Sequence, residues 1–345
     1  MAGKVAIIGT GLIGTSMGLA LRKSKPDSFH IVGVDSDIER SRKAEKMGAL
    51  HRHENNLYQA VKDAEVVILA VPVGAILEVM EDIAPSLPDH CIVTDTGSTK
   101  LQVMKWAEQA LPARVTFIGG HPMAGREVSG PDGARADLFT GAVYCICPPV
   151  AARGDAVQAV VGIAELIGAK PLFIDPDEHD SYVALVSHLP IILASALISS
   201  SNNNQGWREI SRLVSSGYKD TTRLASGDPT MNRDICLSNK EHISHRIDEY
   251  IQELQEWKRL INGDGNELGR LFAHVWEARD RIMQGIDMSK DTKASEKIPS
   301  ATEMLMGTYA KGKLSEVVER WAKSLPGETA KPKDSEPNHP GKKKR

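Results

Sequence analysis

The stretch Lys4-Val5-Ala6-Ile7-Ile8-Gly9-Thr10-Gly11-Leu12-Ile13-Gly14 decides the fold of the first half of this chain. Its apolar, β-branched beginning predicts a buried strand, and an amphipathic helix is expected over 13–22. Strand, glycine-rich turn and helix in this order form the context that a G-x-G-x-x-G dinucleotide-binding loop requires. The same glycine pattern alone occurs by chance in many loops, so its flanking elements carry the prediction.

Each position of this loop has an expected role in holding a dinucleotide. Gly9 permits the tight turn, Gly11 lets a pyrophosphate approach the backbone, and Gly14 lets the helix pack closely on the strand. Leu12 and Ile13 begin the helix, whose free N–H groups and positive dipole end would face the phosphates.

Asp35 follows a second expected strand over 29–34 and lies roughly 20 residues after the glycines, where an acid that binds the ribose hydroxyls is expected. A carboxylate there repels a 2′-phosphate, which favours NAD over NADP. Arg40 and Arg42 are close in sequence and could accept a phosphate, so NADP stays an alternative.

Strands and helices alternate over residues 1–175, which predicts a doubly wound, mostly parallel Rossmann domain. Ligands bind such a sheet at the carboxyl ends of its strands. The remaining expected strands are 65–71, 91–95, 116–119, 143–147 and 171–174. The residues that fall at their carboxyl ends are Val71, Pro72, Thr96, Ser98 and His121.

Residues 176–290 have helical periodicity and predict an all-α domain. Two apolar stripes, one over 243–257 and one over 268–282, are expected on helices separated by the turn Gly263-Asp264-Gly265. Such helices beside a Rossmann domain often build a homodimer, although the stripes could equally pack within one chain. The apolar segment 183–198 is expected to be a buried helix, too short to span a membrane.

The last residues give weaker signals. A short helical extension is expected over 291–325, and the Pro-, Lys- and Glu-rich segment 326–345 is expected to be disordered. The formal net charge of −3 over 345 residues argues against nucleic acid or a membrane surface as the main partner. The four cysteines form no C-x-x-C pair, and no secretory signal is expected, so we predict free thiols in the cytoplasm.

Two polar, glycine-rich segments, Thr94-Asp95-Thr96-Gly97-Ser98-Thr99-Lys100 and 119–130, place candidate catalytic groups at the ligand edge. A nicotinamide enzyme needs a base beside the carbon that loses hydride, and histidine suits this role. His121 is the candidate base, and Ser98 could hydrogen-bond either His121 or the substrate hydroxyl. The alternative is a loop histidine that caps a backbone group.

With these residues in place, the chain resembles the prephenate and arogenate dehydrogenases of tyrosine biosynthesis from about residue 3 to about residue 290. The most specific motifs are Gly120-His121-Pro122-Met123-Ala124-Gly125 and Ser187-His188-Leu189-Pro190, in this order. Leu138-Phe139-Thr140-Gly141 and Asp220-Thr221-Thr222-Arg223-Leu224-Ala225 also match.

The resemblance implies an NAD-dependent oxidative decarboxylation. His121 would bind and polarise or deprotonate the C4 hydroxyl of the substrate ring, supported by Ser98. Arg223 would hold a substrate carboxylate, because a guanidinium binds a carboxylate with two parallel hydrogen bonds. The alternative for Arg223 is a helical ion pair with Asp220, which could also orient it.

Two further residues receive roles from the resemblance. His188 would line the substrate pocket, or else be a core histidine satisfied by a carbonyl that Pro190 leaves free. Glu127 matches an acid near the site mouth, where it could gate the loop through an ion pair, or it is an exposed surface acid. The chain departs from the family pattern at Arg126, Ile191 and Asn232, which puts the shape of the pocket in doubt. No metal site is expected.

Three classes of function follow. The first is a dehydrogenase that acts on prephenate, with arogenate as the alternative substrate. The second is another Rossmann enzyme with a helical domain, such as a β-hydroxyacid dehydrogenase or an imine reductase. The third is a dinucleotide sensor, which could dispense with His121, Ser98 and Arg223 together.

Overall fold

The computed structural model describes residues 3–285 apart from 27, 127 and 264, and it begins with a doubly wound sheet. Eight strands pair in the order β3-β2-β1-β4-β5-β6-β7-β8, and every pair is parallel except β6–β7. The predicted Rossmann architecture is therefore confirmed. The strands are β1 (Gly3–Ile8), β2 (Phe29–Val34), β3 (Arg52–His53), β4 (Val66–Leu69), β5 (Ile92–Asp95), β6 (Thr116–Pro122), β7 (Val143–Cys147) and β8 (Lys170–Phe173).

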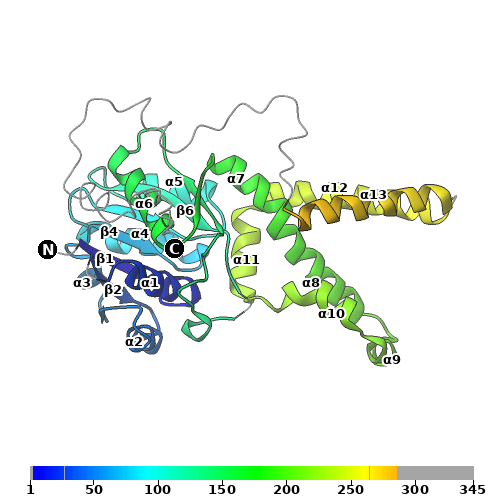
Figure 1. Ribbon diagram of the computed structural model, residues 1–345, viewed down its shortest axis with the longest axis horizontal. Coiled ribbons are helices and arrows are strands. Elements are labelled where there is room, and N and C mark those ends of the chain that lie inside the picture. The colour runs from blue at the N-terminus through cyan, green and yellow to red at the C-terminus, as the bar shows by residue number, and fades with distance from the viewer. Residues whose placement is uncertain (1–2, 27, 127, 264, 286–345) are drawn as a thin grey trace, which may run out of the picture.

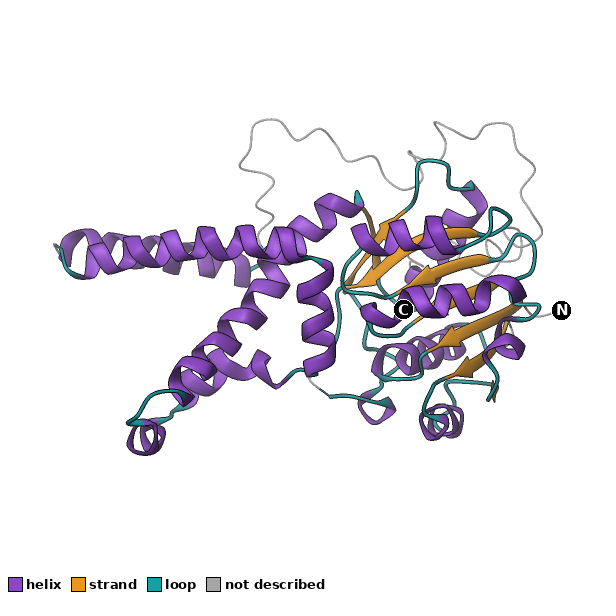
Figure 2. Ribbon diagram, turned by 180° about the vertical axis from the view of Figure 1, so that it is seen from behind, coloured by secondary structure: helices purple, strands orange, loops and turns teal. Residues whose placement is uncertain are grey.

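Helices cover both faces of this sheet (Figure 2). They are α1 (Leu12–Ser24), α2 (Ile38–Lys46), α3 (Leu57–Val61), α4 (Ile76–Ile83), α5 (Leu101–Ala110) and α6 (Gly154–Leu166). Successive residues of β1 alternate between two cores: Val5 and Ile7 pack with α1 and α6, whereas Ala6 and Ile8 pack with α3, α4 and α5. Because both faces are buried, the strand is apolar throughout, as parallel strands are.

The strands differ from expectation at two places that affect the site or the edge. β6 extends to Pro122 instead of ending at 119, because β7 pairs with it antiparallel and His121 lies opposite Cys145. The two-residue edge strand β3 was not predicted, since Arg52–His53 carries no apolar pattern.

Short 3₁₀ turns connect some of these elements: η1 (Val73–Ala75), η2 (Ala84–Ser86) and η3 (Pro131–Gly133). The cysteines are free thiols, of which Cys91, Cys145 and Cys147 are buried and Cys236 is partly buried.

From residue 176 onward the described chain is helical, which confirms the predicted all-α domain. Its elements are α7 (Pro176–Val183), the π-helical turn η4 (Ala184–His188), α8 (Leu189–Asn202), α9 (Trp207–Ile210), η5 (Ser211–Leu213), α10 (Ser216–Thr222), η6 (Arg223–Ser226), α11 (Pro229–Ser238), α12 (Lys240–Ile261) and α13 (Gly265–Met283). Figure 1 shows two arms that diverge from the sheet: α8, α9 and α10 form one, and α12 and α13 the other.

Two of these helices begin at Asp-Pro pairs. Asp175 caps α7 by accepting hydrogen bonds from the Asp177 and Glu178 N–H groups, with Pro176 at the first helical position. Asp228 caps α11 in the same way through the Met231 N–H. An acidic cap followed by proline is a strong helix start, because proline needs no N–H partner there and its φ suits the helix.

The prediction of one buried helix over 183–198 is wrong in two respects. The segment belongs to a longer helical stretch, Pro176–Asn202, and much of its apolar surface is exposed, with Val186 at 67%. By length and composition this stretch could cross a membrane, although a single such helix is weak evidence, because helices covered by protein have the same composition. Among the described residues no other helix qualifies. The predicted extension over 291–325 and tail over 326–345 lie outside the described residues.

Candidate active site

The glycine loop between β1 and α1 has the geometry of a dinucleotide cradle. Gly9 has φ +91°, and a Cβ built on it would lie 2.3 Å from the Ala70 carbonyl oxygen. A Cβ on Gly14 would lie 2.0 Å from the Gly9 carbonyl oxygen, so both positions exclude side chains. In contrast, a Cβ on Gly11 meets nothing within 4 Å. Gly11 therefore borders open space, as the approach of a pyrophosphate requires.

The first turn of α1 is open toward the same space. Gly11 is its N-cap and has no side chain, and no other side chain in the described part of the chain accepts a hydrogen bond from the N–H groups at Leu12 and Ile13. Uncapped N–H groups at a helix N-terminus are an anion-binding feature. Thus the residues present fit the pyrophosphate of a dinucleotide.

Asp35 lies beside this loop at the end of β2. Its Oδ2 accepts a hydrogen bond of 2.7 Å from the Thr10 N–H, and its Oδ1 accepts one of 3.0 Å from the Asp37 N–H. The carboxylate therefore sits where a ribose would follow the pyrophosphate. Arg40 pairs with Asp37, and Arg42 pairs with Glu39 at 2.6 Å, so both nearby guanidiniums already have carboxylate partners.

Three further expected cofactor residues lie at the carboxyl ends of the neighbouring strands. Val71 and Pro72 follow β4 after Ala70, and Val71 Cγ1 lies 3.0 Å from the position of a Cβ on Gly9. Thr96 follows β5, and its N–H donates to the Leu69 carbonyl at 3.0 Å. The sheet thus brings these residues to the edge that Gly9 borders.

His121 is buried at the end of β6 and belongs to a hydrogen-bonded relay. Its Nδ1 lies 2.9 Å from Nε2 of His179, and Nδ1 of His179 lies 2.8 Å from Oδ1 of Asp180, both on α7. Burial holds the pKa of His121 well below its usual value, and the nearby His179, Lys100 and His188 lower it further. His121 is therefore neutral at physiological pH and can act as a hydrogen-bond acceptor or base.

The expected support of His121 by Ser98 is not present. The ring partner of His121 is His179, and no hydrogen bond among the described residues involves the Ser98 hydroxyl. Helix α7 places His179, and not Ser98, beside Nδ1 of His121. The alternative that Ser98 bonds the substrate hydroxyl stays a prediction.

A buried ion pair connects the two glycine-rich segments that the sequence singled out. Lys100 and Asp95 are fully buried, and the Lys100 ammonium donates to Asp95 Oδ2. Asp95 also accepts from the Gly97 N–H at 2.8 Å and from the Gly120 N–H at 3.0 Å. This carboxylate therefore fixes the loop after β5 against the strand that carries His121.

His188 lies in the π-helical turn just before Pro190. Its Nδ1 is 3.2 Å from Nδ2 of Asn239, which also donates to the Asp180 carbonyl at 2.8 Å. Burial lowers the pKa of His188 to about 4. Among the described residues its buried Nε2 has no well-aligned hydrogen-bond partner, although the Ser98 backbone raises the pKa of this ring. A buried polar atom of this kind needs a partner, which a bound ligand would supply.

The remaining expected substrate residues lie in the helical domain or outside the described residues. Asp220 is exposed near the end of α10, and Arg223 is exposed at the beginning of η6, which packs on α8. Neither contacts the His121 relay in a described hydrogen bond or ion pair, so their substrate roles stay predictions. Glu127 lies outside the described residues.

Sequence reasoning missed His179, Asp180, Lys100, Asp95 and Asn239 as parts of the site. Asp95 and Lys100 were quoted within a motif, but nothing local indicates that a lysine at the start of a helix folds back to an aspartate. The His179-Asp180 dipeptide offers only one signal, a histidine next to an acid at the point where the helical domain begins. Among the described residues no group of three or more His, Cys, Asp or Glu side chains could hold a metal ion.

Comparisons with known proteins agree with this architecture. Residues 17–172 match the family model "Prephenate dehydrogenase, nucleotide-binding domain", and residues 175–274 match "Prephenate dehydrogenase, dimerization domain". A prephenate dehydrogenase of Bacillus subtilis is 35% identical over 285 residues, which cover 82% of this chain and 76% of the relative. A cyclohexadienyl dehydrogenase of Zymomonas mobilis is 32% identical over 278 residues, which cover 80% and 94%.

A solved structure shares the arrangement of both domains. The crystal structure of prephenate dehydrogenase from Aquifex aeolicus in complex with hydroxyphenyl propionate and NAD⁺ has a TM-score of 0.75 and 29% identity, covering 83% of this chain and 99% of that one. This chain thus belongs to the prephenate dehydrogenase family and is an NAD-dependent dehydrogenase.

Proposed function

We propose that this enzyme converts prephenate to 4-hydroxyphenylpyruvate by NAD-dependent oxidative decarboxylation. The observation that carries the proposal is His121 at the carboxyl end of β6, where burial holds its pKa well below the usual value. At the same edge of the sheet, the loop around Gly11 between β1 and α1 leaves space for a dinucleotide. Family membership supplies the reaction, and these residues supply groups that it needs.

The residues that would hold NAD are the loop from Gly9 to Gly14, Asp35, and the strand ends at Val71, Pro72 and Thr96. When bound, NAD supplies the hydride acceptor. His121 Nε2 accepts the hydrogen bond of the C4 hydroxyl and takes up its proton as hydride leaves C4. The bond from C1 to its carboxylate then breaks, carbon dioxide departs, and the electron pair enters the ring. The proton returns to the oxygen of the new phenol, so no net proton is exchanged with solvent.

Substrate binding uses both domains in this proposal. Arg223 holds a substrate carboxylate and Asp220 orients the guanidinium, supported by the match of this segment to the family motif. His188 lines the pocket, supported by its buried Nε2, which has no well-aligned partner among the described residues. Ser98 bonds the substrate hydroxyl, and Glu127 controls access near the mouth.

The test is NADH formation by the purified full-length protein with prephenate or arogenate, first with NAD and then with NADP. We expect turnover of prephenate with NAD. The relatives include a cyclohexadienyl dehydrogenase as well as prephenate dehydrogenases, so preferential turnover of arogenate would replace the substrate and keep the chemistry. No turnover of either substrate would refute the proposal.

A matched variant tests the role of His121. In His121→Asn the amide nitrogen lies near the position of Nδ1 and can still donate to His179, but no group replaces Nε2. We expect kcat to fall about 10²- to 10⁴-fold, the usual contribution of a general base, while NAD affinity is unchanged. A near-normal kcat would exclude His121 as the base.

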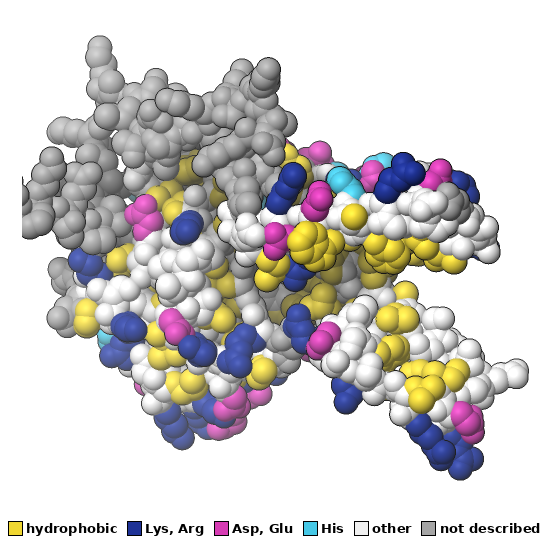
Figure 3. Space-filling view, turned by 45° about the vertical axis from the view of Figure 1, so that its right-hand side comes forward, with side chains coloured by type: hydrophobic (Ala, Val, Ile, Leu, Met, Phe, Trp, Pro, Cys, Tyr) yellow, Lys and Arg dark blue, Asp and Glu magenta, His cyan; other side chains and the backbone are white. Residues whose placement is uncertain are grey.

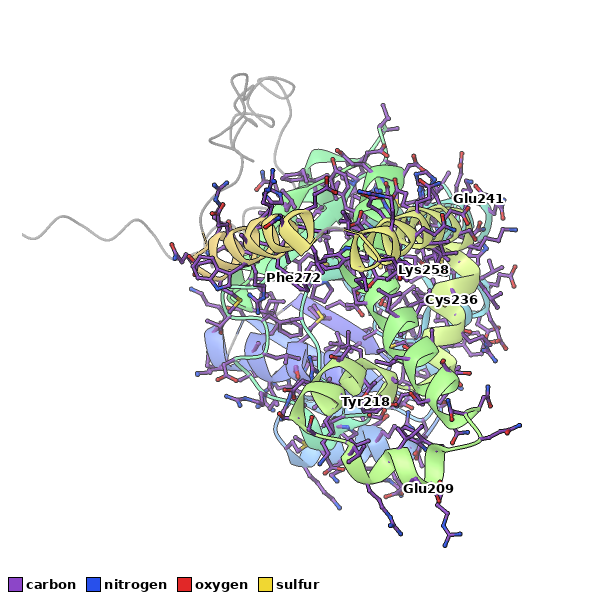
Figure 4. The ribbon with its side chains drawn as sticks, turned by 90° about the vertical axis from the view of Figure 1, so that its right-hand side faces the viewer. Glu209, Tyr218, Cys236, Glu241, Lys258 and Phe272 are labelled. Carbon is purple, nitrogen blue, oxygen red and sulfur yellow. The ribbon has the colours of Figure 1, made fainter. Side chains whose placement is uncertain are left out.

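We further propose that the enzyme is a cytoplasmic homodimer assembled through its helical domain. Figure 3 shows open space between the two arms, with hydrophobic side chains gathered on the surfaces that border it. In Figure 4, Phe272 on α13 is well separated from Tyr218 and Glu209 on the other arm. The exposed apolar side chains of these arms include Leu197, Ile198, Ile251, Leu254, Phe272, Val275, Trp276 and Ile282.

An apolar surface of this extent on a monomer indicates a partner, and a match to a dimerization domain over 175–274 supports a second copy. Sedimentation of the protein purified without detergent tests this. Leu254→Glu is expected to shift the protein to a monomer. Gln109→Glu, which introduces the same residue at an exposed position on α5, is the control and should remain a dimer. A monomeric wild-type protein, or one that needs detergent, would contradict the dimer.

A further inference from the structure

His179 and Asp180, which were not among the expected site residues, form a chain of hydrogen bonds with His121. His179 and Asp180 are each 1% exposed. The rings of His121 and His179 meet edge to face, with centroids 5.1 Å apart and an interplanar angle of 69°. These hydrogen bonds are therefore shielded from solvent and fixed in geometry.

Asp180 is anchored from three directions. Its Oδ1 accepts from the Lys100 N–H at 2.7 Å, and its Oδ2 accepts from the Leu101 N–H at 2.9 Å, so it caps the N-terminus of α5. The third donor is His179. Two backbone N–H groups and the positive end of a helix stabilise a carboxylate in its ionised form.

These contacts determine where the protons lie. A carboxylate oxygen accepts, so a His179 ring with a single N–H carries that hydrogen on Nδ1, and its Nε2 is then an acceptor. His121 must then donate its Nδ1–H to His179. The remaining lone pair of His121 is on Nε2, the nitrogen that a substrate hydroxyl needs.

We propose that His179 is a positioning residue, which together with Asp180 holds His121 in the Nδ1–H tautomer. The role in turnover rests on the proposed function. When Nε2 takes up the hydroxyl proton, His121 becomes an imidazolium whose Nδ1–H still donates to His179. Asp180 supplies the compensating negative charge one ring away, and the same proton returns to the phenol oxygen.

The effect on rate has a known scale. A catalytic histidine held in the wrong tautomer by substitution of its aspartate in a serine-protease triad loses about 10⁴-fold in kcat. Here one neutral contact is removed and the carboxylate remains, so we expect a smaller loss in His179→Leu, about 10- to 10³-fold in kcat. KM and NAD affinity should change little, because His179 is buried behind His121.

His179→Gln is the conservative variant. Its side-chain oxygen can accept the His121 Nδ1–H, whereas leucine cannot. We expect His179→Gln to recover much of the lost kcat. His30→Gln makes the same substitution at an exposed histidine on β2. It is the control and should have wild-type kcat. Asp180 itself is a poor test, since its loss would also uncap α5.

A spectroscopic readout separates positioning from structure. Long-range ¹H–¹⁵N spectra of the histidine-labelled enzyme without cofactor report which ring nitrogen carries a proton, and His121→Asn assigns the signals. At pH 8 we expect His121 to be protonated at Nδ1 alone in the wild type and in His179→Gln. In His179→Leu the Nε2–H form should become populated.

A wild-type His121 protonated at Nε2 would overturn the proposal, as would His179→Leu with wild-type kcat. If His179→Leu fails to fold, the wild-type spectrum and the kcat of His179→Gln decide. The proposal is supported if the wild-type His121 is protonated at Nδ1 and His179→Gln keeps at least about a tenth of the wild-type kcat. The absence of either result overturns it. A protein with the expected tautomer but no turnover of prephenate or arogenate would refute the proposed function alone.

Discussion

Alanine at position 11 tests whether the cradle at the end of β1 holds the cofactor. The backbone at Gly11 has φ −72°, which any residue adopts, and its Cβ would meet nothing within 4 Å. Replacing glycine by alanine at a compatible position stabilises a protein by about 0.4–1 kcal/mol, because it reduces the entropy of the unfolded chain. The free energy of unfolding of Gly11→Ala should therefore equal or slightly exceed that of the wild type.

Cofactor binding should change in the opposite direction. The added methyl group occupies the space through which the pyrophosphate approaches the backbone. Overpacking by one such group costs about 1–3 kcal/mol, which corresponds to NAD affinity about 5- to 150-fold weaker. Calorimetric titration with NAD measures this change, and urea unfolding followed by circular dichroism measures stability.

Gly14→Ala is the matched control, because its methyl group collides with the protein itself. Its Cβ would lie 2.0 Å from the Gly9 carbonyl oxygen and 3.0 Å from Ile7 Cγ2. We expect a loss of about 1–3 kcal/mol in the free energy of unfolding, together with weaker NAD binding. The reasoning fails if Gly11→Ala binds NAD like the wild type, or if it is destabilised as much as Gly14→Ala.

Three further predictions concern charges at the site. Asp35→Asn removes the carboxylate that repels a 2′-phosphate, so the kcat/KM ratio for NAD over NADP should fall about tenfold or more; an unchanged ratio would exclude Asp35 as the discriminating group. Lys100→Met leaves Asp95 buried without its cation, so the free energy of unfolding should fall by about 3–5 kcal/mol in urea titrations. Equal stability of the variant and the wild type would show that the ion pair is dispensable. The pKa of His188 is about 4 in the folded protein and about 6.5 in the unfolded chain, so between these values the unfolded chain binds more protons. Its contribution to stability is therefore complete above pH 6.5 and is lost as the pH falls toward 4. The urea midpoints of the wild type and His188→Gln should converge over this interval, and parallel curves would contradict the assignment.

The Rossmann domain was predictable because its signals are local. Each strand buried on both faces is a short apolar run, and the glycines have separate steric reasons: Gly9 for positive φ, Gly14 for close packing and Gly11 for open space. The position of His121 also followed from topology, since the residue after a parallel strand lies at the ligand edge. Such features need only the chain within a few residues of the site.

The relay behind His121 was not predictable because it depends on tertiary approach. His179 and Asp180 are separated from His121 by more than a complete strand and helix, and they meet it only because α7 packs against α5 and brings His179 to the end of β6. Lys100 likewise has the pattern of a solvated residue at a helix start, yet its side chain is fully buried and paired with Asp95. The spacing of residues in the sequence reveals contacts within one turn or one strand. The contacts of His179, Asp180 and Lys100 join residues that are farther apart in the sequence or depend on tertiary packing.

The stretch Pro176–Asn202 shows a different limit, since its sequence indicates burial but not what covers it. On one side Ala184 and His188 are buried against the site, whereas Leu185 and Val186 on the other side are exposed. Apolar side chains on both sides of a helix need partners on both sides, and η6, α10 and α12 cover only part of this stretch. In the proposed homodimer a second copy would cover this remaining apolar surface, and the π-helical turn would then connect the proposed interface to His188, which we propose lines the substrate pocket.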